Sequence, residues 1–145
     1  SQGDPLPLLI EQDSPAFDPQ LLEIFRQEAQ THLDTLNRFL DQASAHMPLH
    51  ASDDLQRAVH TLKGSAHMAG VLPMAELAAP LDHLVREYKA HHVALDLDEI
   101  ELLLEADGLL HRGLKQLDVD PLADIQGARS LIERTECLIA DRLDA

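Results

Sequence analysis

The sequence has very few of the residues on which disulfide-linked, aromatic-rich or membrane-spanning proteins depend. Its 145 residues include no tryptophan, one tyrosine, three phenylalanines and one cysteine, Cys137. A single cysteine excludes an internal disulfide framework and fits a reducing compartment, so we expect a cytoplasmic protein with Cys137 as a solvated thiol. No apolar run approaches the roughly 20 residues that a membrane-spanning helix needs, and no signal peptide is evident.

Positive charge is also scarce. The chain has 11 Lys and Arg against 26 Asp and Glu, which gives a formal net charge of −15 at pH 7. Such a surface repels phosphate groups, so we expect neither nucleic acid nor an anionic membrane as a partner. The abundant residues are Leu, Ala, Glu and Asp, which favour helix, and the chain is long enough to bury one sizeable core.

Apolar residues recur every three or four positions along most of the chain, which predicts amphipathic helices and no strand. The expected helices start at Asp18-Pro19, at Ser52 or Asp53, at Leu72, at Asp96 and at Asp120-Pro121. Antiparallel helices with short loops form a bundle, so we predict an all-α fold, an antiparallel four-helix bundle with one additional helix. The proline-containing residues 1–16 are assigned as a tail or linker, and residues 17–145 as the domain.

Local signals refine these helices. Two pairs have the spacing of capping boxes, Asp53 with Gln56 and Asp96 with Glu99. Pro80 lies inside the third helix and predicts a kink there, because its ring removes one backbone hydrogen bond. In the fourth helix, the expected inward positions are Ile100, Leu103, Leu104, Leu110, Leu114 and Leu117.

The most informative stretch lies in the second expected helix, where residues 60–65 read His-Thr-Leu-Lys-Gly-Ser. On a helical projection an apolar stripe occupies one face, and His60, Gly64 and His67 fall on the opposite face. Glycine within a helix costs roughly 1 kcal/mol against alanine, and its usual justification is a close approach to the backbone. We infer that Gly64 leaves room for a partner that must reach His60.

An exposed, neutral imidazole can attack phosphorus through a free nitrogen lone pair. Phosphoryl transfer requires mainly positioning of the groups and cations near the moving negative charge. Lys63 lies one turn from His60 and is the candidate cation. Arg57, one turn before His60, and His67, about 10 Å further along the same face, are candidate partner-binding residues.

This stretch resembles the His-x-x-Lys-Gly signature of histidine phosphotransfer (HPt) domains, including those of CheA-type chemosensory kinases. Residues 17–42 are similar to the acidic first helix of the same domains. The resemblance implies a phosphohistidine carrier of a two-component phosphorelay, in which His60 accepts a phosphoryl group from a kinase or receiver domain. It then passes that group to a response-regulator aspartate, so receiver domains are the implied partners.

The same resemblance implies a module of a larger CheA-like or hybrid sensor kinase, whose ATP-binding domain is a further candidate partner. CheA-type domains often carry a histidine and a glutamate on the next helix that bond to the accepting imidazole. Aligned from Gly70, these positions fall at Ala79 and Asp82. Asp82 is then a shorter substitute for the glutamate, and we group it with the partner-binding residues, whereas the missing histidine weakens the case for phosphorylation by an attached ATP-binding domain.

Two other classes of function stay open. The first is an acidic helical module that binds a partner without chemistry. The second is a metal-binding bundle, which the nine histidines suggest; however, neither Cys-x-x-Cys nor His-Glu-x-x-His occurs, so we expect no metal site. The chain also has no nucleotide-binding glycine loop, so we expect no cofactor in this domain and no autonomous catalysis.

Overall fold

The structure, a computed structural model, describes residues 17–143, and the expected tail or linker at 1–16 lies outside these residues. The described residues form five helices: α2 (Pro19–Ala45), α3 (Asp53–Ala69), α4 (Leu72–Ala90), α5 (Leu97–Gln116) and α6 (Ala128–Leu143). No strand occurs between residues 17 and 143, although Leu49 and Leu95 form an isolated antiparallel bridge that joins two loops. The predicted all-α fold is confirmed.

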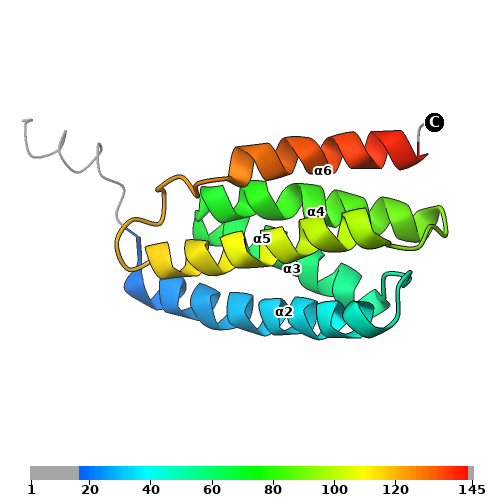
Figure 1. Cartoon of the computed structure of the whole chain (residues 1–145). Coiled ribbons are helices and arrows are strands. Elements are labelled where there is room, and N and C mark those ends of the chain that lie inside the picture. The colour runs from blue at the N-terminus through cyan, green and yellow to red at the C-terminus, as the bar shows by residue number, and fades with distance from the viewer. Residues whose placement is uncertain (1–16, 144–145) are drawn as a thin grey trace, which may run out of the picture.

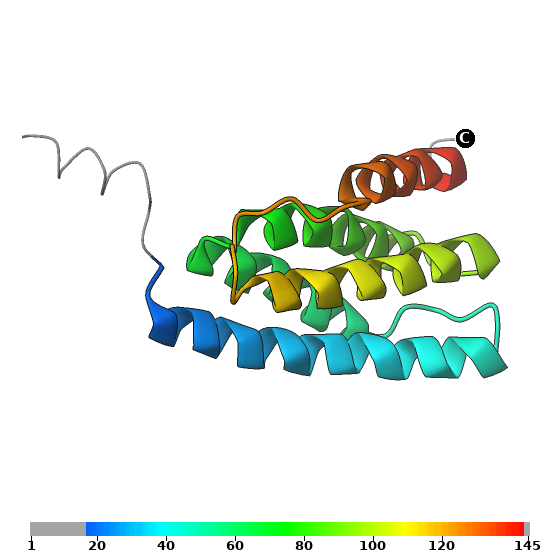
Figure 2. The ribbon, with the colours of Figure 1, turned by 60° about the vertical axis from the view of Figure 1, so that its left-hand side comes forward.

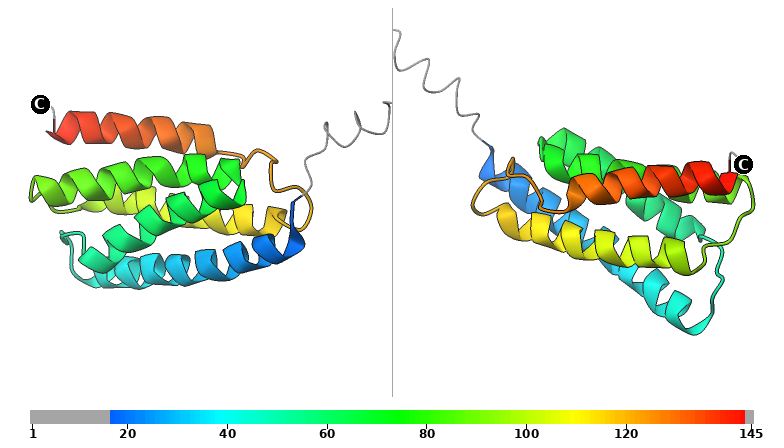
Figure 3. Two further views of the ribbon diagram at one scale, coloured as in Figure 1. Left: turned by 180° about the vertical axis from the view of Figure 1, so that it is seen from behind. Right: turned by 45° about the horizontal axis from the view of Figure 1, so that its top comes forward.

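Four of the helices form a closed bundle. In it α2 packs on α3, α3 on α4, α4 on α5, and α5 on α2. Seen from behind, α3 runs diagonally between α2 and α4 (Figure 3). The fifth helix, α6, lies outside this ring, against α4 and α5 and away from α2 (Figures 1 and 2). The prediction of a four-helix bundle with one additional helix is therefore confirmed.

Aliphatic side chains fill the bundle, as the scarcity of aromatic residues requires. The following large side chains are among those that are fully buried: Leu33, Leu36, Leu55, Leu62, Leu77, Leu81, Leu84 and Leu103. Leu104 was expected to face inward, but 53% of it is exposed. It lies on the outer side of α5 at the edge of α6, which does not cover it.

Both ends of α3 are fixed by local interactions. Ser52 is the N-cap, because its hydroxyl accepts a hydrogen bond from the Leu55 amide at 3.1 Å. The expected capping box at Asp53 is wrong: Asp53 is the first helical residue, and its carboxylate accepts a hydrogen bond from Lys89 at 2.6 Å. At the other end Gly70 has φ +79°, a left-handed conformation that glycine adopts without strain and that ends the helix.

The start of the last helix differs from the prediction. Residues 118–127 form turns, and α6 begins only at Ala128. The Asp120 carboxylate accepts a hydrogen bond from the Leu122 amide at 2.9 Å, so the residues expected to start the helix form a turn instead. Gly127 then takes a left-handed φ of +94°, which changes the chain direction before α6.

The predicted capping box of α5 is confirmed and also joins three helices. Glu99 accepts hydrogen bonds from the Asp96 amide at 2.9 Å and, through Oε2, from the Tyr88 hydroxyl of α4 at 2.7 Å. The Arg142 guanidinium of α6 lies 3.3 Å from the same Oε2. Burial, followed by the hydrogen bond to Glu99, raises the pKa of Tyr88 well above its ordinary value, so its hydroxyl keeps the proton that it donates.

α4 is continuous through Pro80, whose ring is buried, and the expected kink stays a prediction. Among the described helices, none combines the length and the apolar character that crossing a bilayer requires.

Asp107 of α5 provides a test of how the burial of a carboxyl group affects stability. Its Oδ1 lies 3.4 Å from Nδ1 of His111 but accepts no hydrogen bond within the described residues. Burial raises the pKa of Asp107, so the protonated folded state is favoured and its stabilisation is lost as the pH rises through the folded pKa. We expect Asp107→Asn to raise the melting temperature by roughly 3 °C at pH 7, with a smaller gain near pH 4.

Thermal melts of wild type and variant at the two pH values measure this difference. Asp41→Asn, an exposed change with the same effect on net charge, serves as the control and should shift the melting temperature by less. Equal gains at both pH values would contradict the assigned cause.

Candidate functional site

His60 lies near the middle of α3, on the face turned away from the core. Its side chain is 64% exposed, as predicted, whereas Leu55, Val59 and Leu62 on the opposite face are buried. The α3–α4 contact passes beside His60, so side chains of α4 can meet the imidazole from its inner side.

The residue that meets it is Asp82 of α4. Oδ2 of Asp82 lies 3.4 Å from Nδ1 of His60, 3.0 Å from Nζ of Lys63 and 3.3 Å from NH1 of Arg86. The Asp82 side chain is only 2% exposed. A buried carboxylate is expensive unless cations or donors surround it, and here one oxygen faces two cations and an imidazole. We call these four residues the Asp82 cluster.

The cluster corrects one expectation. Asp82 was grouped with the residues that bind a partner, but its burial leaves almost no surface for a partner to touch. It lies behind His60, with Oδ2 facing Nδ1 of the ring. This corresponds to the role that the resemblance implies for the acidic residue on the second helix.

The position of Asp82 also distinguishes the two imidazole nitrogens. A carboxylate only accepts hydrogen bonds, so Nδ1, which faces Asp82, carries the proton in the neutral ring. Nε2 then has the free lone pair. At 3.4 Å the contact with Asp82 is long for a hydrogen bond. The arrangement suits a nucleophilic nitrogen that is exposed on one side and supported on the other.

A shallow hollow of about 370 Å³ lies beside His60. It is lined by Asp53, Gln56, Arg57, His60, Asp82 and Arg86. Arg57 also donates to the Asp54 carboxylate at 3.2 Å. The hydrogen bond from Lys89, and then its charge, lower the pKa of Asp53, so the carboxylate at this edge of the hollow is ionised and paired.

Arg86 is the residue that sequence reasoning missed. Its spacing of four from Asp82 is a signal for an ion pair on a helix, but acidic and basic residues have this spacing at many places in the chain. Only the rotation of α4 about its axis shows that the pair faces His60, and the hydrophobic pattern does not fix this rotation closely enough.

The other predicted residues lie on the same face of α3. Gly64 and His67 are exposed. A Cβ atom at Gly64 would meet no atom within 4 Å, so the glycine is not required by packing. The His67 side chain makes no hydrogen bond or ion pair within residues 17–143, and it stays a candidate partner contact. Lys63 is paired with Asp82, and its role toward a phosphoryl group stays a prediction.

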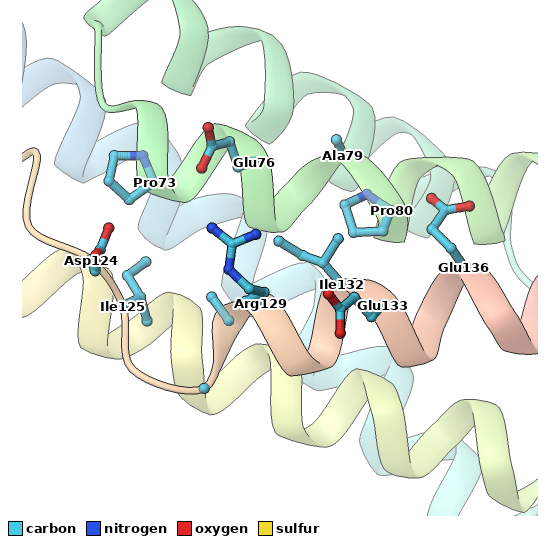
Figure 4. A pocket seen from close by; sticks show the side chains of 12 residues that line it. Pro73, Glu76, Ala79, Pro80, Asp124, Ile125, Arg129, Ile132, Glu133 and Glu136 are labelled. Carbon is cyan, nitrogen blue, oxygen red and sulfur yellow. The ribbon is translucent and has the colours of Figure 1, made fainter.

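A larger hollow lies elsewhere on the described structure. A groove of about 640 Å³ runs between α4 and α6, lined by proline, isoleucine and alanine side chains with acidic residues at its edges. Figure 4 shows Arg129 of α6 pointing between the two helices, with Ile132 beside Pro80. Ala79 lines this groove and supplies no second imidazole to His60. Because the groove has no cluster like that at Asp82, we place the functional site at His60.

Comparison with known families identifies the family of the chain. A family model described as Hpt domain matches residues 20–119. The chain belongs to the Hpt domain family. The match spans α2 to α5, which include the whole Asp82 cluster, and ends before α6. Membership supports a role as a phosphohistidine carrier in a phosphorelay, and Hpt domains typically interact with receiver domains.

Metal binding and the single thiol are the other two candidate chemistries. Within residues 17–143, no three His, Cys, Asp or Glu side chains come together in a group that could hold a metal ion. Cys137 is exposed, as predicted.

Gly64 can be tested against a matched residue, Gly108 of α5, which is also exposed and helical and where an added Cβ atom would likewise meet no atom within 4 Å. We expect alanine at either position to stabilise the domain by up to about 1 kcal/mol, because alanine is the better helix former. Gly64→Gln should slow phosphotransfer with a partner, because its side chain lies over the approach to His60. Gly108→Gln should leave the rate unchanged.

Thermal melts and transfer rates of the four variants measure these effects. A wild-type transfer rate in a normally folded Gly64→Gln variant would show that the partner does not approach over Gly64.

Proposed function

We propose that His60 is the phosphorylated residue of this Hpt domain and that it exchanges the phosphoryl group with a receiver aspartate. The observation that carries the proposal is the buried Asp82 carboxylate directly behind an exposed imidazole. The open backbone at Gly64, one turn away, supports access by a partner.

The proposed reaction uses the two nitrogens of His60 differently. Nε2 attacks the phosphorus of an aspartyl phosphate on the receiver, and an N–P bond forms as the P–O bond breaks. The receiver carboxylate leaves with the electron pair. The proton stays on Nδ1, so the phosphorylated ring becomes positively charged, and the Asp82 carboxylate 3.4 Å away stabilises that charge. The reverse sequence returns the phosphoryl group to another receiver.

We also propose that the chain is a module of a larger CheA-like or hybrid sensor kinase. The His60–Lys63–Gly64 motif and the acidic residue at position 82 support this context. Ala79 supports exchange with a receiver over direct phosphorylation by an attached ATP-binding domain, because no second histidine assists His60. A phosphorylated receiver and a kinase with ATP can both serve as donors in a test of His60.

Replacement of the accepting residue tests the assignment. Incubation with a phosphorylated receiver, or with a histidine kinase and ATP, should give acid-labile phosphate on wild type and none on His60→Gln. Helicity and melting temperature should be nearly unchanged, because the His60 side chain is 64% exposed. His50→Gln, an exposed change in the loop before α3, is the control and should keep full labelling.

Labelling of His60→Gln on another histidine would contradict the site. Absence of labelling on wild type with several donors would favour the alternative, an acidic helical module without chemistry.

Asp82→Asn tests the supporting carboxylate. The amide has a similar shape but no charge, so the positive ring is less stable and we expect labelling to slow by roughly tenfold or more. Asp54→Asn, which removes the exposed partner of Arg57, should have little effect. If the two variants are labelled at the same rate as wild type, Asp82 does not support the reaction.

A further inference from the structure

The charges around His60 are unusual for this acidic chain. Lys63 and Arg86 both face the single carboxylate of Asp82, so the cluster carries one more positive than negative charge when His60 is neutral. The whole chain has a net charge of −15. A local excess of positive charge beside the accepting imidazole therefore requires an explanation.

Two guanidinium groups flank the hollow next to His60. Arg57 comes from α3, one turn before His60, and Arg86 comes from α4. NH1 of Arg86 and Nδ1 of His60 contact the same oxygen of Asp82, which places the guanidinium beside the ring. The other guanidinium nitrogens of Arg86 make no hydrogen bond within residues 17–143, and its side chain is 48% exposed. Arg86 thus has donors free toward the hollow.

Lys63 is held differently from the arginines. Its side chain is 28% exposed, against 48% for Arg86 and 71% for Arg57, and its ammonium is the nearest cation to Asp82. If Arg86 turns away, Asp82 keeps Lys63 and the His60 ring as partners. The buried carboxylate is therefore not left unpaired when Arg86 changes partner.

We propose that the hollow is the binding site of the phosphoryl group on His60, with Arg86 as its principal ligand and Arg57 as a second. This inference rests on the proposed phosphorylation of His60. A phosphoryl group brings roughly two negative charges and three strong acceptor oxygens. The planar fork of a guanidinium can donate to two of these oxygens at once. On phosphorylation Arg86 exchanges Asp82 for the phosphoryl oxygens, while Lys63 stays on Asp82.

The exchange balances the charges of the site. Before phosphorylation Asp82 compensates part of the charge of Lys63 and Arg86. Afterwards the positive ring and Lys63 face Asp82, and Arg86 faces the phosphoryl group. Arg57, which is paired with Asp54 at 3.2 Å and is largely exposed, faces the group as the second ligand. The hollow therefore holds the group in one orientation on the exposed side of the helix, next to the open backbone at Gly64.

The experiment uses phosphoramidate as the donor, so it needs no cognate partner. Its N–P bond breaks as the bond to Nε2 forms, and ammonia leaves. The ionisation of the phosphoryl group on His60 is then followed by phosphorus NMR as a function of pH. Nearby cations favour its dianion, so we expect a higher titration midpoint in Arg86→Ala, with a roughly threefold change in the ionisation constant. Arg57→Ala should shift the midpoint less, and Arg86→Lys should restore part of the wild-type value.

Arg38→Ala, which removes an exposed arginine of α2, is the matched control and should leave the midpoint at the wild-type value. Thermal melts verify that each variant is folded, and Arg86→Lys gives an independent reading if Arg86→Ala is unstable. A wild-type midpoint in both Arg86 variants overturns this inference but leaves the assignment of His60 intact. If a phosphorylated receiver labels wild type and His60→Gln alike, the proposed function itself fails.

Discussion

A carboxylate buried between two helices must be paired, and this requirement governs the site of the protein. Asp82 lies in α4 at the contact with α3, where 2% of its side chain is exposed. Lys63 and His60, which compensate it from α3, lie one turn apart on that helix and reach it only from one rotation of α3. The stripe from Leu55 to Leu62 sets that rotation by burying the opposite face. The packing of the core therefore also positions the imidazole.

The net charge of the chain and the charge of the Asp82 cluster have opposite signs. A net charge of −15 repels phosphate in general, yet the hollow that holds the phosphoryl group under our proposal has two arginines beside Asp53 and Asp82. An acidic surface also favours partners with basic docking faces and discourages non-specific contact with nucleic acids. A negative net charge of the whole chain is thus compatible with a positively charged site for the phosphoryl group.

Most of the fold followed from the apolar period of the sequence, because burial of one face fixes both the type and the approximate length of a helix. The same pattern located His60 and Gly64 on an exposed face. It did not locate Arg86, because an error of one residue in the rotation of α4 turns a side chain by about 100°. Local signals were less reliable than the period: Ser52 and not Asp53 caps α3, and Asp120 closes a turn. In both places several residues could supply the same hydrogen bond, and only the path of the backbone selects one.

The left-handed turn at Gly70 has a consequence for how the length of the chain can vary. It is the only connection between α3 and α4, and it joins them without a loop that could absorb a change in length. One residue inserted or deleted between Gly70 and Asp82 would rotate the carboxylate out of the contact with α3 and bring another side chain to His60. In residues 118–127, by contrast, the backbone forms turns on the surface, and extra residues there displace no member of the Asp82 cluster. Variation in length among related chains should therefore collect before α6 and be absent from the first half of α4.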